Sequence, residues 1–339
     1  MLDLVTESFN LCADEYIELV TDAWDATPLN SEKGPFSFTS KCWQAGPYML
    51  SLFTIGPLIY DIQPVHLDIE GPILVFEKLL SGFAYGERGA SEQHHTPGPI
   101  YLIGQQGTGK SVGTEITIQE FYVPRELVGI ACNETAPARA INPTSLFGKI
   151  VHAEWDAVFQ SATMGQSKVT TQTFERLVTA IKIALGVSPQ REDVRSEARE
   201  LMSRQIQRFI VQNLESPDLS VEQVLNQHGV SRASLYRMFE TYGGIRSFVT
   251  NLRASKAILD IWQNENQRGI VRSAGARWGF STGNDFNRTV RRLYGNSPKR
   301  LFSGDRLNGQ HVRKVPAFAG SFVDQRWNSL SEAPTKVAV

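Results

Sequence analysis

Residues 229–239 read Gly-Val-Ser-Arg-Ala-Ser-Leu-Tyr-Arg-Met-Phe, and this stretch closes at Tyr242-Gly243. A second stretch, residues 279–290, reads Gly-Phe-Ser-Thr-Gly-Asn-Asp-Phe-Asn-Arg-Thr-Val and closes at Tyr294-Gly295. The two stretches therefore contain one pattern, repeated at an offset of about 50 residues, which is typical of two copies of one supersecondary unit.

Each copy predicts a turn followed by a helix. A Gly-apolar-Ser turn comes first, and Ser231 and Ser281 stand where a side chain would cap the first turn of the helix. Apolar residues then recur four apart, which gives each helix one buried stripe: Leu235 with Phe239, and Phe286 with Val290. We expect these helices at about 231–241 and 282–294.

The segments around the two copies complete the pattern. Residues 219–225 form a short amphipathic run with Ser220 as its N-cap, and residues 270–278 occupy the same place before the second copy. Between the copies, residues 247–262 contain no Gly or Pro and have apolar residues on roughly one face. One helix of that length would span about 24 Å. The sequence thus predicts two helix-turn-helix units held apart by a connecting helix.

Residues 198–302 resemble the DNA-binding domain of AraC/XylS-type transcription regulators. The matching elements are the Ser-x-x-x-Leu-Tyr-Arg-x-Phe run at 231–239, the Leu-Arg-Ala-Ser-Lys-Ala-Ile-Leu run at 252–259, Gly279-Phe280, Phe286-x-Arg288 and Tyr294-Gly295-x-Ser297-Pro298. Three positions differ from the family pattern. Ala274 stands in place of a larger aliphatic residue, Gly275 in place of Ala, and Val290 in place of Phe. We expect the second unit to have the smaller core.

The resemblance implies a sequence-specific regulator of transcription, an effector-responsive activator that binds double-stranded DNA and contacts RNA polymerase. Two reading helices on one chain would enter two successive major grooves. The resemblance leaves an effector-independent DNA-binding protein open as an alternative.

Residues that the buried stripes leave exposed on the two helices are the candidates for reading bases. Arg can bond guanine bidentately, Asn can do so with adenine, and Ala can touch the methyl group of thymine. The candidate DNA-binding residues are Ser231, Arg232, Ala233, Tyr236 and Arg237 in the first helix, and Gly283, Asn284, Asn287 and Arg288 in the second. A second reading, in which the arginines contact only phosphates, stays open.

Charge is distributed unevenly along the 339 residues, although the net charge is only -1. Residues 204–315 contain 18 Lys and Arg against 8 Asp and Glu, whereas the rest of the chain contains 16 against 27. Only the C-terminal part therefore has the electrostatic character of a protein that binds a phosphate backbone.

The N-terminal half predicts strands followed by helices, an α+β arrangement. Short β-branched and aromatic runs occur at 36–39, 48–55, 74–76, 100–103 and 115–118, and helical patterns follow at 146–159 and 173–185. Residues 97–103 and 123–127 resemble the cupin-like β-barrel half of the same regulators. That resemblance implies a small-molecule effector and a possible homodimer, with the effector and its binding residues unknown.

These patterns divide the chain into four parts. We expect a cupin-like effector-binding and dimerisation domain at 1–185, a polar linker at 186–197, the all-α tandem helix-turn-helix domain at 198–302, and a disordered tail at 303–339.

Two short motifs invite other functions. Gly104 to Ser111 fits the Gly-x4-Gly-Lys-Ser formula of a phosphate loop, which is the basis of a rival nucleotide-binding protein. A phosphate loop must open a helix, and the run at 112–119 alternates like a strand instead. His94-His95 has no later His in the β-rich region to complete a metal site. We therefore expect no cofactor, no metal and no enzymatic activity.

The three cysteines, Cys12, Cys42 and Cys132, are widely spaced, and this spacing predicts reduced thiols rather than a disulfide framework. The N-terminus lacks the pattern of a signal peptide, and no apolar run is long enough to span a membrane. We expect a cytoplasmic protein.

Overall fold

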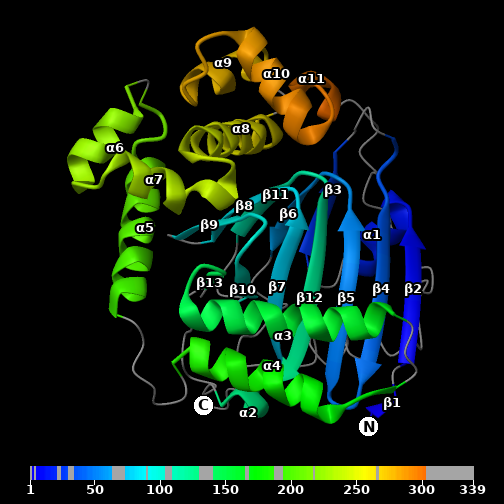
Figure 1. Cartoon of the computed structure of the whole chain (residues 1–339). Helices are drawn as coiled ribbons and strands as arrows, with labels where there is room; N and C mark the ends of the chain where they lie inside the picture. The colour runs from blue at the N-terminus through cyan, green and yellow to red at the C-terminus, as the bar shows by residue number, and fades with distance from the viewer. Residues whose placement is uncertain are drawn as a thin grey trace, which may run out of the picture.

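The computed structural model describes residues 2–3, 5–20, 24–29, 34–62, 73–88, 91–103, 109–129, 140–164, 168–186, 194–216, 218–264 and 267–302. These residues form a β-rich N-terminal part and a helical C-terminal part (Figure 1). The predicted fold class is confirmed. The predicted tail at 303–339 lies outside the described residues.

Two antiparallel sheets form the β-rich part. The larger has the strand order β13 (Ala140–Ile141), β10 (Ile100–Ile103), β7 (Ile73–Ser81), β12 (Ile116–Pro124), β5 (Tyr48–Ile55), β4 (Phe38–Ala45) and β2 (Val5–Leu11). The smaller has the order β3 (Trp24–Pro28), β6 (Leu58–Ile62), β11 (Gly109–Gly113), β8 (Ala84–Arg88) and β9 (Ser91–His95). β1 (Leu2–Asp3) pairs separately with β14 (Lys168–Val169), and α1 (Ala13–Val20) follows β2.

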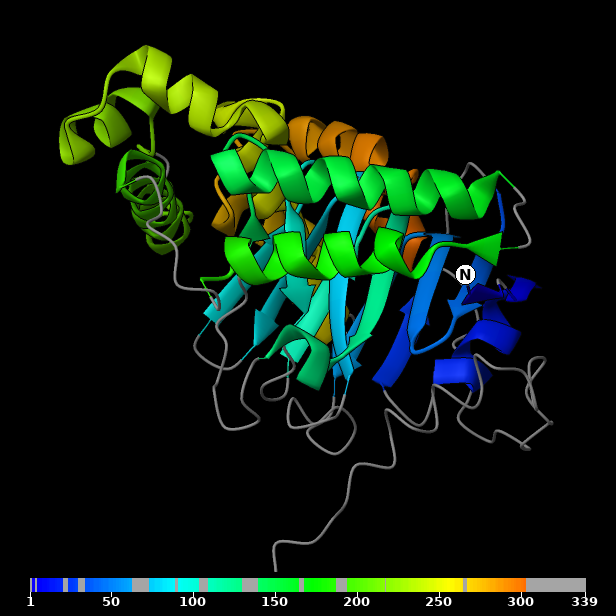
Figure 2. The same cartoon turned by 60° about the horizontal axis from the view of Figure 1, so that its bottom comes forward.

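Two long helices, α3 (Leu146–Thr163) and α4 (Thr171–Ala184), lie side by side over one face of the larger sheet (Figure 2). The short helix α2 (Arg125–Val128) precedes them. Strand side chains such as Trp43 and Phe121 pack against Trp155 and Phe174 of the helices, and all four are almost completely buried. Both predicted helical segments are therefore confirmed, and they cover a sheet face that would otherwise be apolar and exposed.

Each of the predicted strand runs lies wholly or partly in a strand, but β2, β3, β6, β8 and β9 do not follow from those runs. β2 is an edge strand of the larger sheet and β3 an edge strand of the smaller one. Edge strands can keep polar side chains in solvent, and Val5 of β2 is 53% exposed. The hydrophobic alternation of β2 and β3 is correspondingly weak. The sequence pattern of the N-terminal segment therefore did not predict these two strands.

The helical part consists of α5 (Val194–Gln212), α6 (Val221–His228), α7 (Arg232–Met238), a 3-10 turn (Glu240–Tyr242), α8 (Ile245–Gln263), α9 (Ile270–Arg277), α10 (Gly283–Tyr294) and α11 (Pro298–Leu301). The predicted linker at 186–197 is too long, because α5 already begins at Val194. Residues 187–193 of that linker lie outside the described residues.

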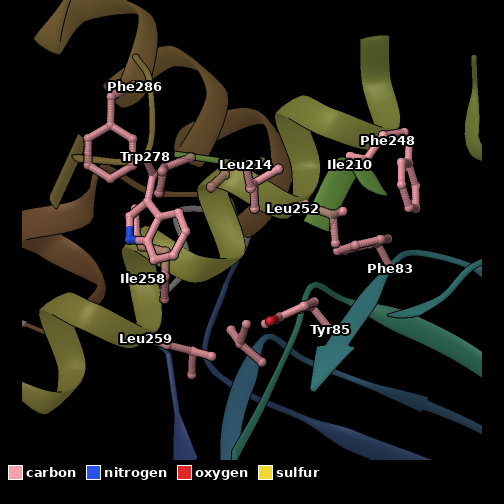
Figure 3. Close-up of a cluster of buried hydrophobic side chains, with 14 of the residues drawn as sticks. Phe83, Tyr85, Ile210, Leu214, Phe248, Leu252, Ile258, Leu259, Trp278 and Phe286 are labelled. Atoms are coloured by element: carbon pink, nitrogen blue, oxygen red, sulfur yellow. The ribbon is translucent and has the colours of Figure 1, made fainter. Parts of the chain in front are cut away.

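The two parts share one hydrophobic core (Figure 3). Phe83 and Tyr85 from the smaller sheet belong to the same buried cluster as Leu252 and Leu259 from α8. A polar contact reinforces it: Lys256 Nζ lies 2.8 Å from Glu87 Oε1 and 5.4 Å from the centre of the Tyr85 ring. The helical part is therefore packed directly on the β-rich part.

Candidate nucleic-acid interface

The first helix-turn-helix unit is built from α6 and α7. Ser220 caps α6 by accepting a hydrogen bond from Gln223 N, and α6 ends at Gly229, whose φ of 62° favours glycine. Ser231 then caps α7 by accepting from Ser234 N at 3.2 Å. Leu235 and Phe239 are fully buried, as their four-residue spacing predicts.

The first of the two helices, expected at about 231–241, is shorter than predicted. α7 ends at Met238, and a 3-10 turn occupies 240–242. Gly243 and Gly244 both have positive φ, and Gly244 N donates to Phe239 O at 2.8 Å. This turn ends the helix before residue 241 and directs the chain into α8.

The second unit is built from α9 and α10, and it begins one residue later than predicted. Thr282, not Ser281, is the N-cap of α10. Its Oγ1 accepts from Asp285 N at 3.1 Å and donates to Asp285 Oδ2 at 2.8 Å. This reciprocal pairing with an acid three residues later stabilises the later start.

The second unit keeps the other predicted features. Gly279 provides the turn with a φ of 74°, and Gly295 ends α10 with a φ of 79°. Phe286 and Val290 are buried in the predicted stripe, together with Tyr294.

Arg253 of α8 binds carbonyls in the segment just before the first unit and in the turn of the second unit. Its guanidinium donates to Leu214 O and Ser216 O before α6, at 3.0 and 2.7 Å, and to Gly279 O in the second unit's turn at 3.3 Å. Burial lowers the pKa of this guanidinium from its usual range. One planar side chain therefore ties the segment that leads into the first unit to the turn of the second.

All nine candidate DNA-binding residues are exposed. They lie away from the buried stripes of α7 and α10, and Tyr236, the largest apolar surface among them, is 40% exposed. The structure therefore brings each set to the surface of its unit, and their contact with DNA stays a prediction.

Two carboxylates that the sequence did not single out hold candidate arginines. Arg232 lies 2.7 Å from Glu222 of α6, and Arg288 lies 2.5 Å from Asp285 of its own helix. The bond from Arg232 lowers the pKa of Glu222, and the bonds from Thr282 and Arg288 lower that of Asp285. The spacing of Asp285 and Arg288 is a recognisable helical pair, whereas Glu222 and Arg232 meet only through the turn.

A row of polar side chains crosses the larger sheet on the face opposite α3 and α4. Its members are successive partners in the strand register: Glu7, Cys42, Ser51, Glu120, Glu77 and Tyr101. Partners in register share a sheet face, and this face is turned toward the smaller sheet. The row could not be found from the sequence, because its residues come from six separate strands.

Hydrogen bonds connect neighbours in this polar row. Glu120 accepts from Ser51 Oγ at 2.8 Å and from Tyr122 OH at 2.5 Å. Burial, with a smaller contribution from Glu77, raises the pKa of Glu120 to about 7. His95 Nδ1 lies 3.0 Å from Glu77 Oε1. The row therefore places ionisable groups between the two sheets.

The described residues of the two short motifs lie in strands, β11 and β9. Lys110 and Ser111 lie in β11, which pairs with β6 and β8 and continues toward β12, so that this part of the Gly-Lys-Ser motif opens no helix. Gly104 to Thr108 lie outside the described residues. His94 packs edge-on against Phe248 with 4.8 Å between ring centres.

Three further observations on the described residues concern metal binding, membrane spanning and the cysteines. The described residues contain no group of three or more His, Cys, Asp or Glu side chains that could hold a metal ion. No helix among them has the length and apolar character needed to cross a membrane. Cys12 and Cys42 are free thiols.

Comparisons with known proteins find likeness only among solved structures. No family model matches the chain, and no curated protein matches its sequence. The crystal structure of the AraC-like transcriptional activator CuxR is 16% identical, covers 73% of this chain and 93% of its own, and has a TM-score of 0.43. ToxT from Vibrio cholerae O395 is 10% identical, covers 73% of this chain and 98% of its own, and has a TM-score of 0.28.

A third structure, wild-type ToxT from Vibrio cholerae strain SCE256 with a bound unsaturated fatty acid, is 11% identical. It covers 88% of this chain and 95% of its own at a TM-score of 0.28. At these sequence identities and TM-scores the likeness assigns no function to this chain. Its function has to be argued from its own residues.

Proposed function

We propose that this chain is a sequence-specific DNA-binding regulator of transcription, of the AraC/XylS type that its C-terminal motifs resemble. The observation that carries the proposal is the pair of helix-turn-helix units on α8, each with a reading helix whose polar face is exposed. Their side chains include Arg and Asn, which match guanine and adenine in the major groove. The excess of basic residues in the same part of the chain supports attraction to phosphates.

Two units on one chain favour an asymmetric site. The reading positions differ between α7 and α10, so one chain would recognise two unlike boxes about one helical turn apart. Arg253 bonds the segment that leads into the first unit to the turn of the second, which favours a fixed spacing between these boxes.

The experiment is a footprint of the full-length chain on duplexes that it selects from a randomised pool. The selected duplex is then compared with a derivative that has five additional base pairs between the boxes. We expect the half-turn insertion to lower affinity by at least about tenfold, because both reading helices can no longer reach their grooves together. Five base pairs inserted outside the two boxes are the matched control for length and should leave the affinity unchanged. Equal affinity for the selected duplex and the five-base-pair derivative would contradict the two-groove arrangement.

Regulation by a small molecule is the second part of the proposal. The polar row between the two sheets supports an effector site in the β-rich part, and its carboxylates favour a neutral or cationic compound over an anionic one. We also propose, from the resemblance, a homodimer formed through the N-terminal part and an activating contact with RNA polymerase. A constitutive DNA-binding protein would bind the selected duplex equally well with and without every candidate compound.

A further inference from the structure

Each reading helix carries an arginine that a carboxylate already holds. Arg232 NH2 donates to Glu222 Oε1 at 2.7 Å, and Arg288 NH2 donates to Asp285 Oδ1 at 2.5 Å. Arg237, also on α7, forms no ion pair with any described residue. The same device thus occurs in both units, with the acid supplied by α6 in one case and by α10 itself in the other.

Stability gives no sufficient reason for these two ion pairs. Both ion pairs are exposed, with side-chain exposures of 54% and 63% for Arg232 and Glu222, and of 81% and 42% for Arg288 and Asp285. Exposed ion pairs of this kind contribute little to folding, since solvent and salt screen them. On a surface that faces phosphates, a carboxylate also weakens the general attraction to DNA. A role in recognition would offset that loss.

A guanidinium is planar and has five N–H donors in a fixed arrangement. When a carboxylate binds one nitrogen, the plane is oriented and the other donors can still reach the paired acceptors of guanine. The carboxylate also neutralises the charge that would otherwise attract any phosphate regardless of sequence. Both effects increase the difference in affinity between a correct duplex and a wrong one.

We propose that Glu222 and Asp285 are specificity-determining positioning residues, which orient Arg232 and Arg288 toward bases and reduce their attraction to phosphates. This inference rests on the proposed DNA-binding function. Glu222 provides the sharper test, because its only bond to a reading helix in the described structure is to Arg232. Asp285 also binds the capping residue Thr282, so its replacement affects the start of α10 as well.

The test compares the full-length wild type with Glu222→Gln, which keeps the shape of the side chain and removes its charge. Each protein is titrated with the wild-type-selected duplex, with its single-base-pair variants and with an unrelated duplex, over a range of salt concentrations. We expect affinity for the unrelated duplex to rise and the salt slope to steepen by about 0.9, as for one additional phosphate contact. Discrimination at one base pair of the first box should fall about five- to tenfold. Asp285→Asn should act likewise on the second box.

Glu215→Gln is the matched control. Glu215 is 55% exposed and lies 3.1 Å from Arg277, which is on α9 and not on a reading helix. This variant changes the net charge by the same amount, and we expect it to leave base discrimination unchanged.

Three results would overturn the inference while leaving the proposed function intact. Glu222→Gln could discriminate as well as the wild type, or it could lose no more discrimination than Glu215→Gln. It could also lose affinity for the selected duplex alone, which would mean that Glu222 itself contacts a base. A wild type that selects no duplex at all would instead remove the proposed function.

Discussion

The two helix-turn-helix units share a sequence pattern but differ in how their cores are filled. In the first, Phe239 packs in a group of rings, 5.0 Å from Phe248 and 5.7 Å from Tyr242 between ring centres. In the second, Phe286 packs against Gly275, where an added Cβ would lie 2.9 Å from the ring. The smaller residues of the second unit therefore do not leave it loosely packed, because the Phe286 ring occupies the space.

The units also meet the β-rich part differently. Near the first unit, the His94 ring lies 5.8 Å from that of Tyr242. Near the second, Lys256 Nζ lies 5.3 Å from the Trp278 ring while it binds Glu87. The same local pattern is therefore stabilised by a contact between neutral aromatic rings in one copy and by a contact between a cation and an aromatic ring in the other. Three measurements test these differences between the two units.

The largest effect should come from removing the core aromatic ring of either unit. Phe239→Ala and Phe286→Ala should each lower the free energy of unfolding by about 3–5 kcal/mol, because both rings are almost completely buried. Chemical denaturation of the full-length chain measures the loss, and Arg272→Ala, at an exposed position, should stay within about 0.5 kcal/mol of the wild type. A Phe286→Ala variant as stable as the control would mean that the second unit is not well packed.

Acid should weaken the first unit's contact with the β-rich part. Burial lowers the pKa of His94 from 6.5 to about 4, so the unfolded chain binds more protons than the folded one between these values. The free energy of unfolding should have its full value above pH 6.5. It should decrease by up to about 3 kcal/mol as the pH falls toward 4.

The measurement for His94 is the free energy of unfolding of the wild type and of His94→Gln between pH 4 and 7. We expect the variant to show a shallower loss on acidification. The variant leaves every other side chain unchanged, so the difference between the two curves isolates His94. Parallel curves would show that His94 is not held neutral.

The smallest effect should come from Gly275→Ala. Its added methyl group meets the ring atoms Cδ1 and Cγ of Phe286 at 2.9 and 3.1 Å, so the ring or the helix has to shift. We expect a loss of about 1–3 kcal/mol in the free energy of unfolding, typical of overpacking. Gly283→Ala is the matched control for stability alone, since its Cβ would meet nothing within 4 Å and should be neutral or stabilising by up to about 1 kcal/mol. A neutral Gly275→Ala would instead reveal free space in the second core.

The two helix-turn-helix units and the helix between them could be predicted from the sequence alone, because their signals are local. Caps such as Ser220 and Ser231, turn glycines such as Gly229 and Gly279, and four-residue apolar spacing all act within one or two helical turns. The same reasoning placed the second cap one residue early, since Ser281 and Thr282 are both good caps and the position of Asp285 favours the second.

The contacts between distant segments could not be predicted from the sequence and are seen only in the tertiary structure. The domains predicted at 1–185 and 198–302 share one core, which contains Tyr85 and Leu259 and depends on how sheet and helix pack. Arg253 reaches carbonyls before the first unit and in the turn of the second, and Glu222 meets Arg232 across a turn. The polar row between the sheets needs the register of six strands. The pairing of distant strands and helices is set by the burial of whole faces. No single stretch of sequence contains that information.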